Sequence, residues 1–198
     1  MTVQQSSKAR RIPTRDRLIA AAFTVVARDG LANASVKTIA GEAGVAPGLL
    51  HYHFPTRTAL LEAALRRGLD EYLAASRLRR AATSPERQID AFFTAAQSLA
   101  ADDRELIRVR LAFAAAALSD HDLRVVLQSL NAEAQRETAM VFANARGANE
   151  PDAKELALAA TIKAAFDGIM LAWLNDPGFP LAVAGRTLEQ AMRVALTA

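Results

Sequence analysis

The chain has 198 residues, of which 52% are hydrophobic and none is cysteine. This length and composition allow one large or two small domains with a packed core and exclude disorder over most of the chain, while the lack of cysteine excludes disulfides and thiolate chemistry. The net charge of +3 is unevenly placed: residues 1–57 contain eight Lys/Arg against three Asp/Glu, and the rest contains sixteen against eighteen. The N-terminal end is therefore the part suited to attract phosphate groups.

Residues 1–13 are predicted to form a flexible basic arm, with Lys8, Arg10 and Arg11 among Gln and Ser residues. This segment is either a disordered tail or an arm that contacts a DNA minor groove or phosphates. It lacks the apolar stretch of a secretory signal, and the longest uninterrupted apolar run, residues 111–118, is shorter than the roughly 20 residues that a spanning helix requires. We expect a cytoplasmic protein without a membrane partner.

Three short helices are predicted in residues 14–56. Thr14 is a candidate N-cap for a helix that ends near residue 28, where Gly30 follows. Ser35 caps a second helix, which ends at Gly44, and Pro47 suits the first position of a third. Two short helices joined by a tight glycine-containing turn form a helix-turn-helix, whose second helix fits the DNA major groove.

The second helix of this motif is predicted to have one buried and one DNA-facing side. Leu50 and Phe54 lie one turn apart and should face the core. The neighbouring side chains and the helix starts, where free N–H groups can meet phosphates, give the candidate DNA-binding residues: Thr14, Lys37, Thr38, Ala46, Pro47, Gly48, Leu49, His51, Tyr52, His53, Thr56 and Arg57.

Two features of this helix have alternative interpretations. Leu49 can either touch a thymine methyl group or pack at the edge of the domain. His51 and His53 are two positions apart, and such side chains diverge on a helix, which opposes a shared metal ion. We expect no metal site and no cofactor, and favour phosphate or base contacts for the histidines.

The same residues resemble the DNA-binding signature of the TetR-type (tetracycline-repressor-like) transcriptional regulators. The resemblance is carried by Ser35-Val36, Ile39-Ala40, Ala43-Gly44-Val45, Gly48-Leu49-Leu50, His53-Phe54, Arg57 and Leu60-Leu61. Ala46, His51 and Arg57 depart from the serine, tyrosine and lysine that are frequent there. In that family the first three helices bind DNA, and the variable C-terminal helices bind an inducer and dimerise, which the resemblance implies for this chain.

Residues 57–198 are predicted to form a helical ligand-binding and dimerisation domain. Apolar residues recur with helical spacing, and capping residues, Pro and Gly mark helices near residues 57–80, 85–99, 102–118, 120–142, 150–174 and 186–196. No strand-like alternation competes with them. With the N-terminal three, this gives an all-α fold of about nine helices.

The C-terminal helices contain no catalytic constellation, so we do not expect an enzyme. Arg110 and Lys163 lie on otherwise apolar stripes, where a cation is either ion-paired, as Lys163 can be with Asp167, or available to hold the anionic group of an apolar inducer. The candidate ligand-binding residues are Phe92, Phe93, Arg110, Phe113, Phe142, Phe166, Met170 and Trp173.

A homodimer is expected because a single helix-turn-helix reads too few base pairs, whereas a twofold pair matches half-sites roughly 34 Å apart. The last two predicted helices have second apolar faces that suggest a four-helix interface, with Leu158, Ile162, Ala165, Ile169, Leu188 and Met192. We therefore predict a ligand-responsive regulator, a repressor released from a palindromic operator on double-stranded DNA by a small, largely apolar inducer. The alternatives are a regulator without a small-molecule effector and a helical carrier or interaction protein.

Overall fold

The computed structural model describes residues 12–102 and 104–197. Within these ranges all regular secondary structure is helical, with nine α-helices and two short 3-10 helices. The all-α prediction is confirmed. The predicted basic arm lies almost entirely outside the described residues.

The N-terminal end of the molecule is built from α1 (Thr14–Asp29), α2 (Val36–Glu42) and α3 (Pro47–His53), with the 3-10 turn η1 (Leu31–Asn33) after α1. The hydroxyl of Ser35 caps α2 by accepting from the backbone N–H of Thr38 at 3.1 Å. The turn between α2 and α3 passes through Gly44 at φ +61°, a conformation that favours glycine. These local signals explain why the helix-turn-helix forms where the sequence predicts it.

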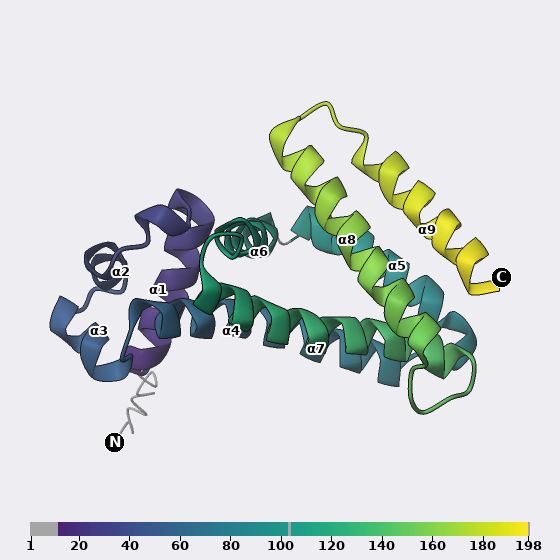
Figure 1. Ribbon diagram of the computed structural model, residues 1–198, viewed down its shortest axis with the longest axis horizontal. Helices are drawn as coiled ribbons and strands as arrows, with labels where there is room; N and C mark the ends of the chain where they lie inside the picture. The colour runs from purple at the N-terminus through teal and green to yellow at the C-terminus, as the bar shows by residue number, and fades with distance from the viewer. Residues whose placement is uncertain (1–11, 103, 198) are drawn as a thin grey trace, which may run out of the picture.

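The rest of the chain forms six helices that continue from this end. They are α4 (Arg57–Ala81), α5 (Gln88–Asp102), α6 (Arg104–Ala116), α7 (His121–Ala145), α8 (Ala153–Asn175) and α9 (Leu181–Thr197), with η2 (Pro85–Arg87) before α5. Figure 1 shows α4 and α7 running side by side from the N-terminal helices toward the opposite end, with the α8–α9 pair above them. α4 begins soon after α3 and runs along α7, so it links the N-terminal helices to the rest of the chain.

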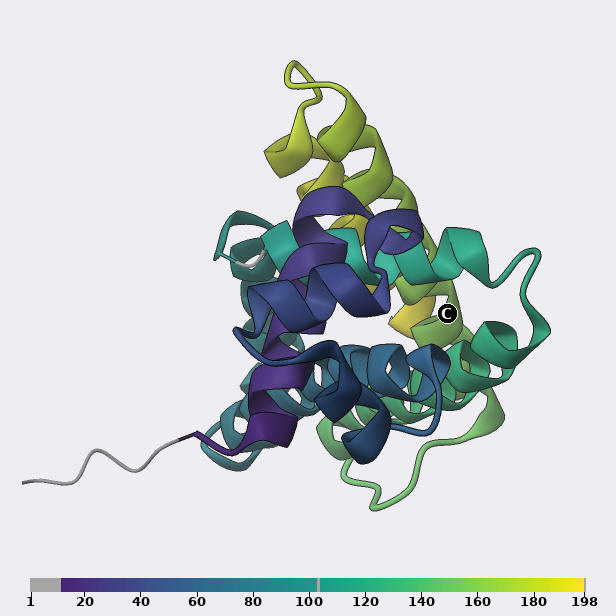
Figure 2. The same ribbon diagram turned by 90° about the vertical axis from the view of Figure 1, so that its left-hand side faces the viewer.

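The hydrophobic core is continuous between the two regions. Leu18 of α1, Leu50 of α3, Leu61 of α4 and Phe113 of α6 belong to one cluster of buried side chains. α6 packs against α1 as well as against α7, and in the end-on view of Figure 2 the N-terminal helices lie in front of these longer helices. A displacement of α4 or α6 is therefore felt directly by α1.

Several helix starts differ from the sequence prediction, including those of α1 and α9. Pro13, and not Thr14, is the N-cap of α1, and its carbonyl accepts from the N–H of Arg17 at 3.1 Å. α9 begins at Leu181 instead of near residue 186, because the carbonyl of Pro180 accepts from the N–H groups of Val183 and Ala184. The glycine at position 185 stays inside the helix, where packing of α9 against α5 and α8 offsets its cost of about 1 kcal/mol.

α8 is more apolar than an interior helix of one subunit requires. By length and composition its 23 residues could cross a membrane, although a core helix of a water-soluble protein passes the same test. In the sequence this helix does not stand out as one long apolar run, because Lys163 and Asp167 interrupt it. Among the described residues, several of its apolar side chains stay exposed, including Ala157, Ala164 and Leu171.

Candidate DNA-binding and effector sites

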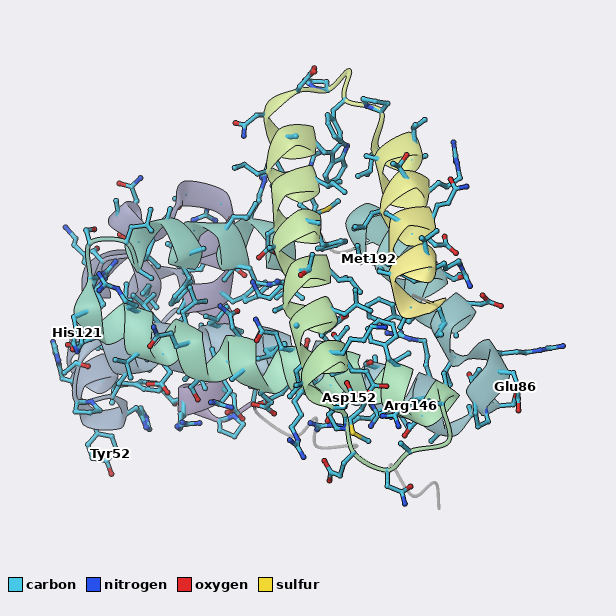
Figure 3. All side chains as sticks on the ribbon, turned by 45° about the vertical axis from the view of Figure 1, so that its right-hand side comes forward. Tyr52, Glu86, His121, Arg146, Asp152 and Met192 are labelled. Carbon is cyan, nitrogen blue, oxygen red and sulfur yellow. The ribbon has the colours of Figure 1, made fainter. Side chains whose placement is uncertain are left out.

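The proposed recognition helix α3 has the two-sided character that its sequence predicts. Leu50 is fully buried and Phe54 nearly so, whereas Leu49 is 42% and Tyr52 81% exposed. Figure 3 shows Tyr52 pointing away from the protein at this end of the molecule. Ala46, Pro47, Gly48 and His51 are exposed as well, and His53 is half-buried with its ring 5.0 Å from that of Tyr52. The outer face of α3 is thus free to enter a groove.

Arg57 has a different role from the predicted phosphate contact. Its guanidinium donates from Nε to the carbonyl oxygen of Ala34 at 2.7 Å and from Nη2 to that of Leu31. These bonds join the first residue of α4 to the segment between α1 and α2, so the side chain is occupied within the protein. The sequence showed the charge of Arg57 but not these carbonyls, which only the folded chain brings near it.

A second arginine braces the turn of the helix-turn-helix. Arg17 of α1 donates from Nη2 to the carbonyl oxygens of Ala43 at 2.5 Å and Gly44 at 3.1 Å. These are carbonyls at the end of α2, which lack a partner within the helix. Arg17 was not among the predicted functional residues, because no local pattern relates it to a turn 26 residues away.

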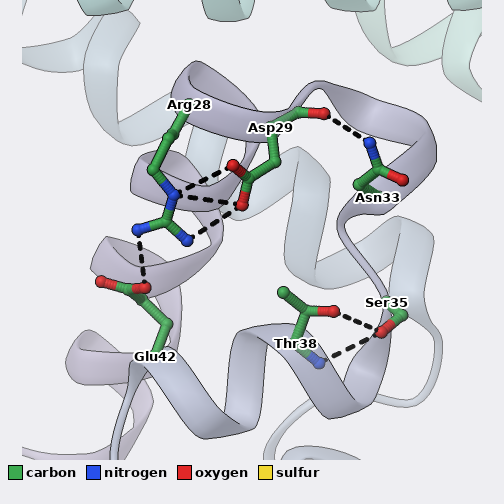
Figure 4. A network of polar contacts seen from close by, with 6 residues as sticks. All are labelled: Arg28, Asp29, Asn33, Ser35, Thr38 and Glu42. Carbon is green, nitrogen blue, oxygen red and sulfur yellow. Dashed lines mark hydrogen bonds and ion pairs between the residues drawn. The ribbon is translucent and has the colours of Figure 1, made fainter.

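The start of α2 is closed by internal hydrogen bonds. The Ser35 hydroxyl accepts from the Thr38 N–H and lies 2.7 Å from the Thr38 hydroxyl, so the predicted free N–H at Thr38 is already bonded. Figure 4 shows this cap beside a second group of contacts, in which Arg28 binds Asp29 and Glu42. Hydrogen bonding to Arg28 lowers the pKa of Asp29, but the group is exposed and adds little stability. The hydroxyl of Thr56 likewise caps α4 by accepting from the N–H of Ala59 at 3.0 Å.

Most of the basic side chains in the described DNA-binding region contact the protein itself. Besides Arg17, Arg28 and Arg57, Arg15 lies with its Cζ 5.1 Å from the centre of the Phe54 ring. Lys37 is exposed and has no hydrogen bond or ion pair with the described residues. Lys37 and Arg15, which is exposed and contacts only a ring, are therefore the basic side chains of α1 to α3 that remain available for a phosphate.

A cavity of about 80 Å³ lies among α4, α5, α6, α7 and α8. Most of its wall is apolar, and its polar or charged residues are Tyr72, Arg110, Asn131, Gln135, Thr138 and Lys163. Burial raises the pKa of the Tyr72 hydroxyl, although the charges of Arg110 and Arg79 act in the opposite direction. The phenol is therefore neutral at physiological pH and can donate a hydrogen bond.

Arg110 and Lys163 meet at one carboxylate. Asp167 accepts from Nη2 of Arg110 at 3.0 Å through one oxygen and from Nζ of Lys163 at 2.5 Å through the other. The predicted Lys163–Asp167 pair is confirmed. Because Arg110 is on α6 and the other two are on α8, this cluster also ties those helices together.

The structure places three of the predicted ligand-binding residues on the cavity wall, namely Phe92, Arg110 and Phe166. The other five are not on the wall of this cavity. Phe113 is fully buried in the main core, and Met170 packs in a separate cluster with Ile107. Phe93 and Phe142 are buried, and the ring of each contacts the ring of Phe92. The Cζ atom of Arg104 lies 4.5 Å from the centre of the Trp173 ring. Helical period shows which residues face inward but not which neighbour they meet.

The cavity reaches the DNA-binding region through Leu106. This residue lines the cavity, and its Cδ1 would lie only 2.7 Å from a Cβ placed on Gly68 of α4. Phe23 of α1 would be 3.0 Å from the same Cβ, so α1, α4 and α6 converge at this glycine. Close packing of this kind transmits displacement.

Comparison with known proteins matches both regions of the chain. Residues 18–64 match the family described as bacterial regulatory proteins of the tetR family, and residues 85–196 match the BetI-type transcriptional repressor C-terminal domain. The chain belongs to the TetR family. Members of this family are DNA-binding transcriptional regulators and not enzymes.

Individual TetR-family relatives agree with this assignment. The regulator UidR of Escherichia coli K12 is 34% identical over 62 residues, which cover 31% of this chain and 32% of UidR, so the match spans about a third of that relative. A transcriptional regulator from Rhodococcus sp. Rha1 is 27% identical, with 93% of this chain and 97% of that one covered and a TM-score of 0.74. A regulator from Saccharomonospora viridis in complex with choline shares the fold at 20% identity, covering 90% and 95%, with a TM-score of 0.66.

The predicted dimer residues of this TetR-family chain are less accessible than expected. Ile162 is 5% exposed and lines the cavity, so its assignment to an interface is wrong. Leu158, Ala165, Ile169, Leu188 and Met192 are half-buried within the subunit. The exposed stripe of α8 is the adjacent one, which consists of Ala157, Thr161, Ala164, Gly168 and Leu171. The residues predicted for the interface are therefore less exposed than this neighbouring stripe, and the interface itself stays a prediction.

Proposed function

We propose that this regulator is a repressor that binds a palindromic operator as a homodimer and is released when a small, largely apolar molecule occupies the cavity. The match of residues 85–196 to a BetI-type repressor domain supports repression as the direction of control. The observation that carries the proposal is the position of Leu106, which lines the cavity and also packs at Gly68, where α1 meets α4. We also propose that the protein acts in the cytoplasm, where its operator is.

DNA binding would use the outer face of α3. Tyr52 and His51 are exposed at its centre and can contact bases or phosphates, and Gly48 lets the backbone approach the sugar-phosphate wall closely. Lys37 would add a phosphate contact from α2. Arg17 and Arg57 support this use indirectly, because they hold the turn and the start of α4 in place.

Release would follow from the small size of the cavity. Its volume of about 80 Å³ is smaller than the ~150 Å³ cavity that holds one benzene molecule in a model protein. A ligand of that size or larger must therefore move wall residues such as Leu106. Displacing Leu106 shifts its packing at Gly68, where Phe23 of α1 also lies, so the ligand favours a different arrangement of α1 and α4.

The two DNA-binding regions would be held together by α8 and α9. The exposed stripe of α8 is rich in small residues, which allow close helix approach, and α9 exposes Val183, Thr187 and Val194 beside it. Two such pairs related by a twofold axis form a four-helix interface. This arrangement gives the unpartnered apolar side of α8 a contact.

The proposal is tested by selecting bound duplexes from random DNA with purified protein and then measuring affinity over a range of salt concentrations. We expect enrichment of a palindrome and a steep loss of affinity as salt rises. A promoter carrying that palindrome should be less active when the protein is present. Failure to enrich any sequence at low ionic strength would refute operator binding, and would favour a helical carrier.

A regulator without a small-molecule effector is the second candidate. It predicts the same palindrome and repression but no compound that both binds the protein and releases the operator. Testing operator release with compounds found by thermal-shift screening separates the two.

A further inference from the structure

At the cavity, two positively charged side chains share one carboxylate, and only the positively charged ones line the wall. Arg110 and Lys163 belong to its wall, whereas Asp167, which accepts from both, is not among the lining residues. The three side chains are about one-quarter exposed or less. The cluster therefore has a net positive charge, and its cationic members face the cavity.

Both cations have donors left over. A guanidinium has five N–H donors and an ammonium has three, and each of these side chains makes one hydrogen bond within the described residues, to Asp167. On α7, Asn131, Gln135 and Thr138 also line the cavity, and their side chains have no hydrogen-bond partner in the described part of the chain. An incoming anion would thus find several unused donors.

The remainder of the wall is apolar. Leu65, Leu69, Leu127, Leu130 and Ile162 line it, together with the rings of Phe92 and Phe166. Aromatic rings can hold an organic cation, but here the positive charge of Arg110 would repel one. That charge extends across the cavity wall, because it also acts on the Tyr72 hydroxyl. A neutral molecule could offer the donors of Arg110 and Lys163 only an uncharged acceptor, which makes weaker hydrogen bonds than a carboxylate.

We propose that the cavity binds small molecules with one carboxylate on an apolar body, and that Arg110 and Lys163 bind the carboxylate. The inference rests on the proposed function only in taking the cavity as the effector site. The ligand's carboxylate replaces Asp167 as an acceptor, so binding also loosens the tie between α6 and α8. Since α6 packs on α1, this links the charge of the ligand to the DNA-binding region.

The test compares pairs of compounds that differ in charge but not in shape. Benzoate and benzamide form one pair, hexanoate and hexanamide form another, and choline serves as a small organic cation. Binding to the full-length protein without DNA is measured by titration calorimetry and by thermal shift. We expect each carboxylate to bind at least roughly tenfold more tightly than its amide, because charge-assisted hydrogen bonds are the stronger ones.

Three variants make the test specific to the cluster. Arg110→Gln should bring the carboxylate-to-amide affinity ratio close to one. Arg108→Gln, at an exposed position on the same helix, should leave the ratio unchanged. Asp167→Asn should raise the affinity for carboxylates several-fold, because it removes the competing acceptor. A ratio measured within one variant is insensitive to how well that variant folds.

Equal or tighter binding of the amides, tighter binding of choline, or no saturable binding of either carboxylate at millimolar concentration would overturn the inference. A decrease of carboxylate affinity in Asp167→Asn would do the same. Release of a selected operator is measured separately. If carboxylates bind as expected without releasing DNA, the proposed function fails and the ligand class stands; if an amide or choline releases DNA, the ligand class fails and the proposed function stands.

Discussion

The two ends of this molecule use the same kinds of side chain in opposite ways. In the DNA-binding end, Arg17 and Arg57 are bonded to backbone carbonyls, and the helices share a densely buried core. Around the cavity, Arg110 and Lys163 share one carboxylate and face an open space. The first arrangement fixes a geometry, while the second leaves donors available and can change partners.

This difference fits the proposed function, in which one chain both reads a fixed groove and responds to a small molecule. A recognition helix must keep its position, so arginines hold its surroundings rigid. A ligand site must have at least two arrangements of similar free energy, so its charges are incompletely paired. The two regions meet at Gly68, where α1, α4 and α6 converge.

The largest expected effect comes from separating the two DNA-binding regions of the proposed dimer. Gly168 is exposed on α8 and has no neighbour within 4 Å of an added Cβ. Gly168→Arg should therefore leave the subunit folded but place a charge in the proposed interface. We expect a monomer by light scattering and at least ~100-fold weaker operator binding, because the linkage of two half-sites is lost. Ala132→Arg, at an exposed position on α7, is the control, and a dimeric Gly168→Arg protein would contradict the proposed interface.

Arg57→Ala tests how firmly the helices of the DNA-binding region are held together. The change removes two hydrogen bonds from a charged donor to the carbonyls of Ala34 and Leu31, so the free energy of unfolding should fall by about 2–4 kcal/mol. Urea unfolding measures this. The exposed Arg67, paired with Glu71 on the same helix, provides the comparison, and Arg67→Ala should cost less than about 0.5 kcal/mol. Equal losses in the two variants would show that Arg57 does not brace the motif.

Gly68→Ala tests the boundary between the ends. The new Cβ would lie 2.7 Å from Leu106 Cδ1, so Leu106 has to move and stability should drop by about 1–3 kcal/mol. The cost should be smaller in a Leu106→Ala background, which a double-mutant cycle measures. Gly41→Ala in α2, where nothing lies within 4 Å, should not destabilise. Additive effects of the Gly68 and Leu106 changes would argue against their contact.

Glu137→Gln tests the charged contacts that hold α4 to α7. Glu137 accepts from Arg77 at 2.9 Å and from Arg80 at 2.8 Å. Burial raises the pKa of this carboxyl, but hydrogen bonds from Arg80 and Arg77 outweigh it, and the pKa lies below its ordinary value of 4.5. A depressed pKa means that the stabilisation is present above pH 4.5 and is lost as the pH falls through the folded-state pKa.

We therefore expect Glu137→Gln to cost about 1–2 kcal/mol at neutral pH, and the difference from the wild type to shrink in acid. Chemical unfolding at several pH values checks this. Glu71→Gln, in an exposed pair with Arg67, is the control and should cost less than about 0.5 kcal/mol at neutral pH. A difference that grew on acidification would have the wrong sign for this contact.

The smallest effect is expected for Lys37→Ala. Because this exposed lysine has no partner among the described residues, its removal should leave stability within about 0.5 kcal/mol. Operator affinity should fall, and the salt dependence of binding should weaken by about one unit in slope. Lys154→Ala, exposed at the start of α8, should change neither quantity. An unchanged salt slope for Lys37→Ala would remove Lys37 from the phosphate contacts.

The sequence allowed accurate prediction wherever the signal was local. Ser35, Gly44 and Pro47 marked the helix-turn-helix, and the spacing of Leu50 and Phe54 gave the buried side of α3. Prediction was weaker where an apolar residue had several possible neighbours. Phe113 and Ile162 were recognised as inward-facing, but Phe113 is in the core and Ile162 is at the cavity instead of the dimer interface.

By itself the sequence determined that the chain is all-helical, where most helices begin and end, and that its N-terminal end carries a helix-turn-helix. Caps, turns and helical period depend on residues within a few positions of one another, so they can be read from the chain. Only the tertiary structure decided that Arg57 donates to the carbonyls of Ala34 and Leu31, that Leu106 meets Gly68, and that Arg110 joins Lys163 at Asp167. These contacts join residues far apart in the chain, and their distances are set by how the helices pack.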